Sequence, residues 1–182
     1  MAWTAPRTWV DGELVTAALM NTHVRDNLNT VRTVHKYKAS DQTVTVTTLT
    51  NDTDLVVPVL ANEVWMIDTY LLIDSNATAD FKCTWTVPAG ATMKWAPVSY
   101  VAGTIWWMTS TGASTTALLN ATDVDTSYQS LSAGNINGIN IKSIAVIGGT
   151  AGNVQFQWAQ VAASANTILK AGSCLIAHRV ST

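Results

Sequence analysis

The spacing of hydrophobic and polar positions changes once along this chain, close to residue 36. Before that point, apolar side chains recur at intervals of three and four, which places them on one face of a helix. These positions are Ala17, Met20, Val24, Leu28, Val31 and Val34. Thr16 precedes them, and its hydroxyl can accept a hydrogen bond from the first turn as an N-cap. The pattern predicts a helix over residues 16–34, which is too short to be stable alone in water and needs a partner surface.

Beyond residue 42 the chain is rich in Thr, Val, Ile and Trp, with Gly, Asn and Asp between the runs. Ten segments read as strands: 43–50, 55–60, 64–73, 81–87, 92–95, 104–109, 116–119, 139–147, 154–161 and 167–180, the last with a break at Gly172. Turn signals separate them, among them Asn51-Asp52 and Gly148-Gly149. Short strands without intervening helices predict a mainly β fold, an antiparallel jelly-roll-like β-sandwich preceded by one short N-terminal helix.

This pattern divides the chain into two parts. Residues 1–38 are expected to form an N-terminal arm and helix that serve attachment and oligomerisation, and residues 39–182 the β-sandwich domain. Residues 64–67 and 71–73 are apolar at consecutive positions, although neighbouring side chains of a strand point to opposite faces. Such strands need cover on both faces, so we expect further copies of the chain to provide it, in a homotrimer.

Composition excludes several classes of function. Charged residues are 12% of the 182, with a net charge of −2 and no dense basic segment, so nucleic acid is not an expected partner. No apolar run approaches the roughly 18–20 residues that span a bilayer, and the first ten residues do not resemble a signal peptide, so no membrane partner is expected. Cys83 and Cys174 are expected to be free thiols, although the sequence leaves a disulfide open.

Few residues of the sequence are candidates for catalysis or metal binding. Glutamate occurs only as Glu13 and Glu63, and the aspartates at 51–54 read as turn formers. The three histidines form no metal-binding motif, residues 123–127 are a weak match to a calcium loop, and residues 148–152 read as a hairpin turn rather than a phosphate loop. We therefore expect no catalytic residues, no metal site, no cofactor and no enzymatic activity.

Two adjacent indoles, Trp106 and Trp107, must point to opposite faces if residues 104–109 form a strand. We expect Trp107 to lie inside the sandwich and Trp106 to form a contact surface for a neighbouring subunit or a ligand. Trp95, Tyr100, Trp106 and Trp107 could also stack against sugar rings, although packing in the core or at a subunit interface is the favoured interpretation.

The segment PRTWVDGELVTAALMNTHVRDNL at residues 6–28 resembles the start of many bacteriophage structural proteins, which share a W-V-x-G-E-x-V-T-A-x-x-M-N stretch followed by a short helix. Residues 154–160 and 169–179 look like the closing strands of similar virion proteins. The resemblance implies a non-enzymatic virion component assembled in the host cytoplasm, a trimeric decoration or accessory protein on the capsid or tail. The alternative is a tail-fibre-type module that binds a receptor or a host-surface glycan. Attachment or oligomer contacts are expected at the following apolar positions: Trp3, Trp9, Val10, Met20, Val24, Leu28 and Val31.

Overall fold

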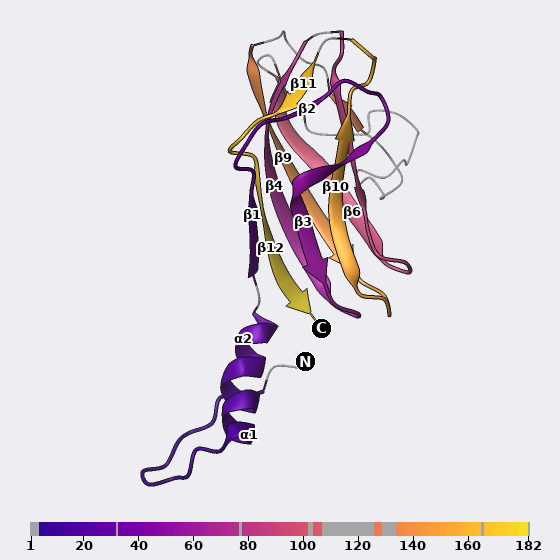
Figure 1. Cartoon of the computed structure of the whole chain (residues 1–182). Helices are drawn as coiled ribbons and strands as arrows, with labels where there is room; N and C mark the ends of the chain where they lie inside the picture. The colour runs from indigo at the N-terminus through magenta and orange to yellow at the C-terminus, as the bar shows by residue number, and fades with distance from the viewer. Residues whose placement is uncertain are drawn as a thin grey trace.

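The computed structural model describes residues 4–31, 33–76, 78–101, 104–106, 126–128, 134–164 and 166–181, with backbone alone for 97–101, 104–106 and 126–128. Within these residues the chain is mainly β: two antiparallel sheets face each other, and a short helical segment of 14 residues precedes them (Figure 1). The predicted fold class is therefore confirmed.

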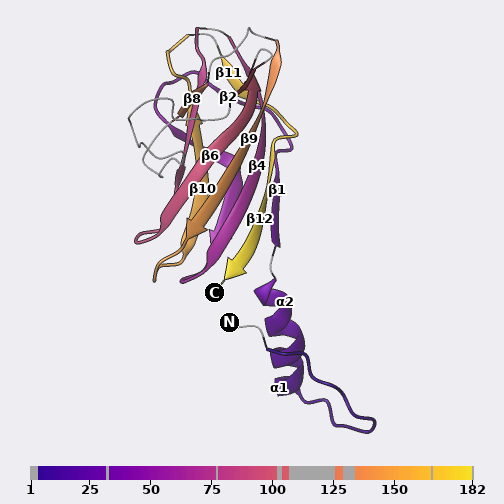
Figure 2. The same cartoon turned by 180° about the vertical axis from the view of Figure 1, so that it is seen from behind.

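The larger sheet has the strand order β1-β12-β4-β9-β6-β7, and the small strands β11 and β2 extend it beside β4. Its strands are β1 (Thr33–Tyr37), β2 (Gln42–Val44), β4 (Val64–Ser75), β6 (Thr92–Val101), β7 (Thr104–Trp106), β9 (Ile136–Val146), β11 (Thr167–Leu169) and β12 (Cys174–Ser181). The smaller sheet has the order β3-β10-β5-β8, from β3 (Thr50–Val59), β5 (Phe81–Thr86), β8 (Thr126–Tyr128) and β10 (Gly152–Ala159). Figure 2 views the larger sheet from its outer side.

The core lies between the two sheets because the long strands alternate buried and more exposed positions. In β4 the inward side chains include Trp65, Ile67 and Leu71, all fully buried. In β10, Phe156 and Trp158 point inward, and their rings contact Trp85 and Phe81 of the neighbouring strand. Each large apolar side chain that leaves water contributes roughly 1.5–3 kcal/mol, so burial of this kind dominates the stability of the sandwich.

The helical segment begins where the sequence predicts and ends earlier. The Thr16 hydroxyl accepts a hydrogen bond from the Leu19 backbone N–H (3.3 Å) as an N-cap. Three elements follow, α1 (Ala17–Met20), the π-helical turn η1 (Asn21–Arg25) and α2 (Asp26–Thr30). The predicted end at Val34 is wrong, because Thr33–Tyr37 is strand β1 and pairs with β12. The β-branched residues there favour a strand, and the sandwich begins before the expected boundary at residue 38.

Several local predictions also need correction. The expected turn at Asn51-Asp52 lies inside β3, and residues 45–49 are not part of a strand. Residues 148–152 do not form a hairpin turn, because β9 and β10 belong to different sheets. The break at Gly172 is confirmed, and its φ of 94° is readily adopted only by glycine. The expected strand at 116–119 lies outside the described residues, as do residues 107–109.

Candidate assembly site

Residues 4–31, here called the N-terminal unit, are held together mainly by polar contacts. Asn27 is the buried residue of the helical segment, and its amide links both sides of the unit. Its Oδ1 accepts a hydrogen bond from the Thr4 backbone N–H (3.0 Å), and its Nδ2 donates to the carbonyl oxygens of Thr4 (2.9 Å) and His23 (3.2 Å). This side chain therefore fixes the extended arm along the helix.

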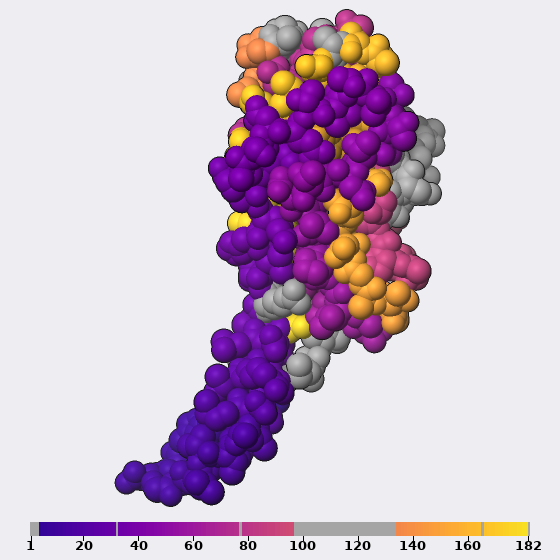
Figure 3. Space-filling view, in the orientation of Figure 1, coloured from indigo at the N-terminus to yellow at the C-terminus, as the bar shows by residue number. Residues whose placement is uncertain are grey.

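The arm is further ordered by Arg7, which forms an ion pair with Glu13 and lies over the ring of Trp9 at 5.0 Å. Trp9 in turn contacts the ring of His23 edge to face, with the centroids 6.4 Å apart. These contacts give the N-terminal unit a defined shape without an apolar core. Figures 1 and 3 show it projecting from one end of the sandwich.

The predicted apolar stripe lies on the surface of this unit. Leu28 and Val31 remain 66% and 61% exposed, and Met20 and Val24 are also exposed. The other expected contact residues in the arm, Trp9 and Val10, are exposed too, and Trp3 lies outside the described residues. The sandwich therefore leaves this stripe accessible to a partner.

The N-terminal unit meets the sandwich at a buried ion pair. Arg179 Nε donates a hydrogen bond to the Thr30 carbonyl oxygen (3.4 Å), and its Nη1 pairs with Glu63 Oε1 (2.8 Å). Burial by itself raises the pKa of Glu63, but hydrogen bonds from the Leu60 N–H, Arg179 and Trp65 Nε1 hold this pKa below its ordinary value. The carboxylate is thus kept charged at the junction.

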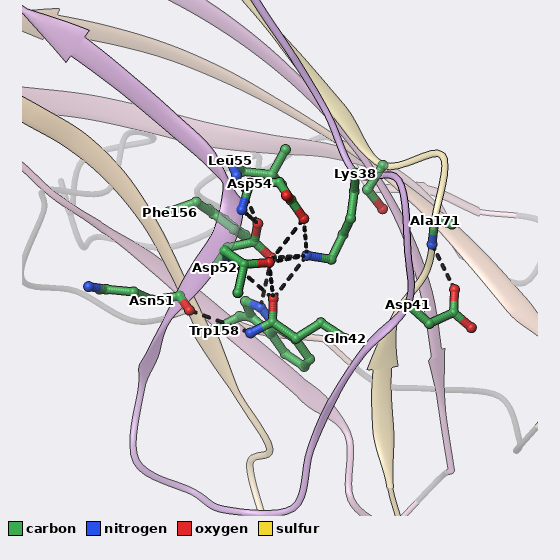
Figure 4. A network of polar contacts seen from close by, with 12 residues as sticks. Lys38, Asp41, Gln42, Asn51, Asp52, Asp54, Leu55, Phe156, Trp158 and Ala171 are labelled. Atoms are coloured by element: carbon green, nitrogen blue, oxygen red, sulfur yellow. Dashed lines mark hydrogen bonds and ion pairs between the residues drawn. The ribbon is translucent and has the colours of Figure 1, made fainter.

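A second buried polar network joins the two sheets (Figure 4). The Lys38 ammonium group, fully buried just after β1, donates to Asp52 Oδ2 (2.9 Å) and Asp54 Oδ2 (3.0 Å) at the start of β3. The same Asp52 oxygen accepts from Trp158 Nε1 (3.3 Å), and the Lys38 contact lowers the pKa of Asp54. Sequence reasoning missed this network because it took residues 51–54 for a turn. Enclosed charges with these partners have a structural role.

The chemical candidates raised by the sequence are only partly described. No group of three or more His, Cys, Asp or Glu side chains that could hold a metal is found among them. Cys83 and Cys174 are free thiols, as expected. Residues 123–125 of the weak calcium motif are not described, and 126–127 belong to β8. No helix in the described part of the chain is long and apolar enough to cross a membrane.

The aromatic candidates for sugar binding are only partly described. Trp95 is fully buried in the core and is not available for stacking. The backbone of Trp106 belongs to β7, but its side chain and that of Tyr100 lie outside the description, as does Trp107. The expected contact role of Trp106 therefore stays a prediction.

Comparisons with known proteins give no match to a family model and none to a curated protein sequence. Function must therefore be argued from the residues themselves.

Proposed function

We propose that this protein is a non-enzymatic structural component of a bacteriophage virion, a homotrimeric decoration or accessory protein. The N-terminal unit attaches it to the particle, and the sandwich is displayed outward. The observation that carries the proposal is the exposed stripe of Met20, Val24, Leu28 and Val31 on a unit that projects from the fold. This stripe belongs to the segment that resembles the start of phage structural proteins.

The energetics support attachment through this unit. Burying the exposed parts of these four apolar side chains against a partner contributes a part of the roughly 1.5–3 kcal/mol that full burial of each would give, which favours attachment. The sandwich gains nothing from the stripe, because these side chains are exposed in the folded chain. A surface that is apolar, ordered and not used by its own domain is typical of an interaction site.

The test is incorporation into particles. We would produce the full chain as Met20→Asp/Val24→Asp in cells that assemble the virion, purify the particles and quantify the protein by immunoblot. We expect incorporation to be lost, because each unpaired buried charge costs a few kcal/mol. The matched control is Thr22→Asp/Asn29→Asp, which adds the same charge at exposed polar positions of the same helical segment and should be incorporated normally.

Normal incorporation of Met20→Asp/Val24→Asp, with the folded sandwich verified by circular dichroism, would overturn the proposal. Immunogold labelling of wild-type particles would then assign the location. Labelled heads favour a capsid decoration protein, and a labelled tail favours the tail-fibre alternative, for which binding of the chain to host cells is the deciding assay.

A further inference from the structure

The outer face of the larger sheet carries many exposed apolar side chains, with polar ones such as His178, Asn140 and Lys142 among them. This face is defined by the side chains of β1, β12, β4, β9 and β6 that point away from the core. Its exposed large side chains are Tyr37, Met66, Tyr70, Ile136, Ile144, Val146, Ile176 and Val180. The strand register makes most of them neighbours, since Met66 lies opposite Ile144 and Tyr70 lies one row from Ile176. These residues form one surface rather than isolated exposed positions.

The smaller sheet shows that this composition is not general to the fold. Its outward positions include Lys82 and Thr86 of β5 and Asn153, Gln155 and Gln157 of β10. Such side chains are well hydrated, and one polar outer face is what an antiparallel sandwich normally presents to water. This density of exposed apolar side chains is therefore specific to the larger sheet, whose outer face is here called the apolar face, and it is typical of a contact surface.

The charges on the apolar face cancel at its centre. Lys142 of β9 forms an ion pair with Asp68 of β4 (2.9 Å), in the row between Met66 and Tyr70. Lys94 of β6 lies opposite Ile144, and Asp74 of β4 lies opposite Ile136. A centre without net charge does not suit a strongly charged partner, whereas two copies of it can meet without repulsion.

The outer face of the larger sheet is not flat. Tyr70 lies over Gly138, and its hydroxyl oxygen is 2.9 Å from where a Cβ would stand at that glycine. Beside this ring is a hollow of about 120 Å³, lined on the outer face by Asn140, Lys142, Cys174 and Ile176. Because Met66 and Ile144 project nearby, one surface carries both projecting side chains and a hollow.

The extent of the face matches an interface between folded proteins. Five neighbouring strands about 4.8 Å apart, with roughly ten residues rising about 3.3 Å each, span on the order of 700 Å². A standard interface buries roughly 800 Å² for each partner. We propose that the outer face of the larger sheet is the interface with further copies of this chain. This inference rests on the oligomeric part of the proposed function and names the surface that forms the oligomer.

The experiment measures the mass of the purified full-length chain by light scattering at micromolar concentration. Ile144→Asp places a charge at an exposed position beside Met66 on the face, and Thr86→Asp is the matched control on the smaller sheet. The wild type and Thr86→Asp should have the mass of several chains. Ile144→Asp should have the mass of a single chain, 19.5 kDa.

The two native thiols provide a second readout. Cys174 borders the hollow on the face, and Cys83 is buried in the core. In the wild type both should resist maleimide, as read by intact-mass spectrometry. In folded Ile144→Asp, Cys174 alone should react, because the neighbouring copy no longer covers it. Reaction of Cys83 as well would report unfolding, and Met66→Lys is then the replacement variant.

A wild type that is monomeric, or one whose Cys174 reacts as fast as in urea-unfolded protein, would overturn the inference. So would an unchanged mass of folded Ile144→Asp and Met66→Lys, or equal dissociation of Thr86→Asp. If both face variants unfold, Cys174 labelling of the wild type decides. These results concern the chain in solution, whereas the attachment proposal is decided on particles, so either can fail alone.

Discussion

The N-terminal unit and the sandwich use apolar residues in opposite ways. In the sandwich, large side chains such as Trp65, Ile67 and Phe156 are fully buried between the sheets. In the N-terminal unit the buried helix residue is the polar Asn27, and Leu28 and Val31 are exposed. The hydrophobic effect therefore stabilises the sandwich internally, whereas the stripe of the N-terminal unit gains free energy only when a partner covers it. The contrast shows that the chain itself covers the core of the sandwich but not the stripe of the N-terminal unit.

The largest expected effect compares the loss of a buried cation in the sandwich with the loss of a partly exposed cation in the N-terminal unit. Lys38→Met leaves the Asp52 carboxylate buried without its cation, which should lower the free energy of unfolding by about 3–5 kcal/mol. Arg7→Met removes the cation of the partly exposed pair with Glu13 and should change the sandwich little. Urea denaturation followed by circular dichroism at one protein concentration measures both. Equal midpoints for Lys38→Met and the wild type would contradict the structural role of the network.

A pair of truncations should sharpen the comparison. Ile67→Ala opens a cavity between the sheets and should cost about 2–5 kcal/mol. Leu28→Ala removes a side chain that is exposed on the helix and should stay within about 0.5 kcal/mol of the wild type. The same denaturation measurement applies. A large loss of stability in Leu28→Ala would show that the stripe packs against the sandwich in solution. The distinction between the two regions would then fail.

The smallest expected effect is the change with pH in the stabilisation that Glu63 contributes. The pKa of Glu63 in the folded state is below its ordinary value of 4.5, so its stabilisation is complete above that pH and is lost as the pH falls through the folded pKa. The stability gap between wild type and Glu63→Gln should therefore narrow below about pH 4.5. Thermal melts between pH 7 and pH 3 measure it. Asp11→Asn removes a carboxylate at an exposed position of the arm and is the matched control, which should melt close to the wild type at pH 7.

The sequence predicted those features that depend on neighbours along the chain. The Thr16 cap and the exposed stripe through Met20 and Val24 each follow from spacing within about a dozen residues. The doubly apolar runs also led us to expect cover on both faces of these strands, and this stays a prediction. Tyr37 and Ile176 lie on the outer face of the larger sheet only because β1 pairs with β12, and these two strands are far apart in the sequence.

Only the tertiary structure decided where the helix ends and which charged side chains are paired and buried. Val34 fits the helical spacing, but pairing with Ala177 offers its backbone a strand partner, and that contact is invisible to a local pattern. From the sequence alone Asp52 is interpreted as a turn residue. In the fold its carboxylate accepts hydrogen bonds from Lys38 and Trp158, which belong to two other strand regions. By itself the sequence determined which segments are apolar and with what period, since burial of a face follows from side-chain spacing. Which charges are buried together depends on contacts between distant segments, and these exist only once the two sheets have packed.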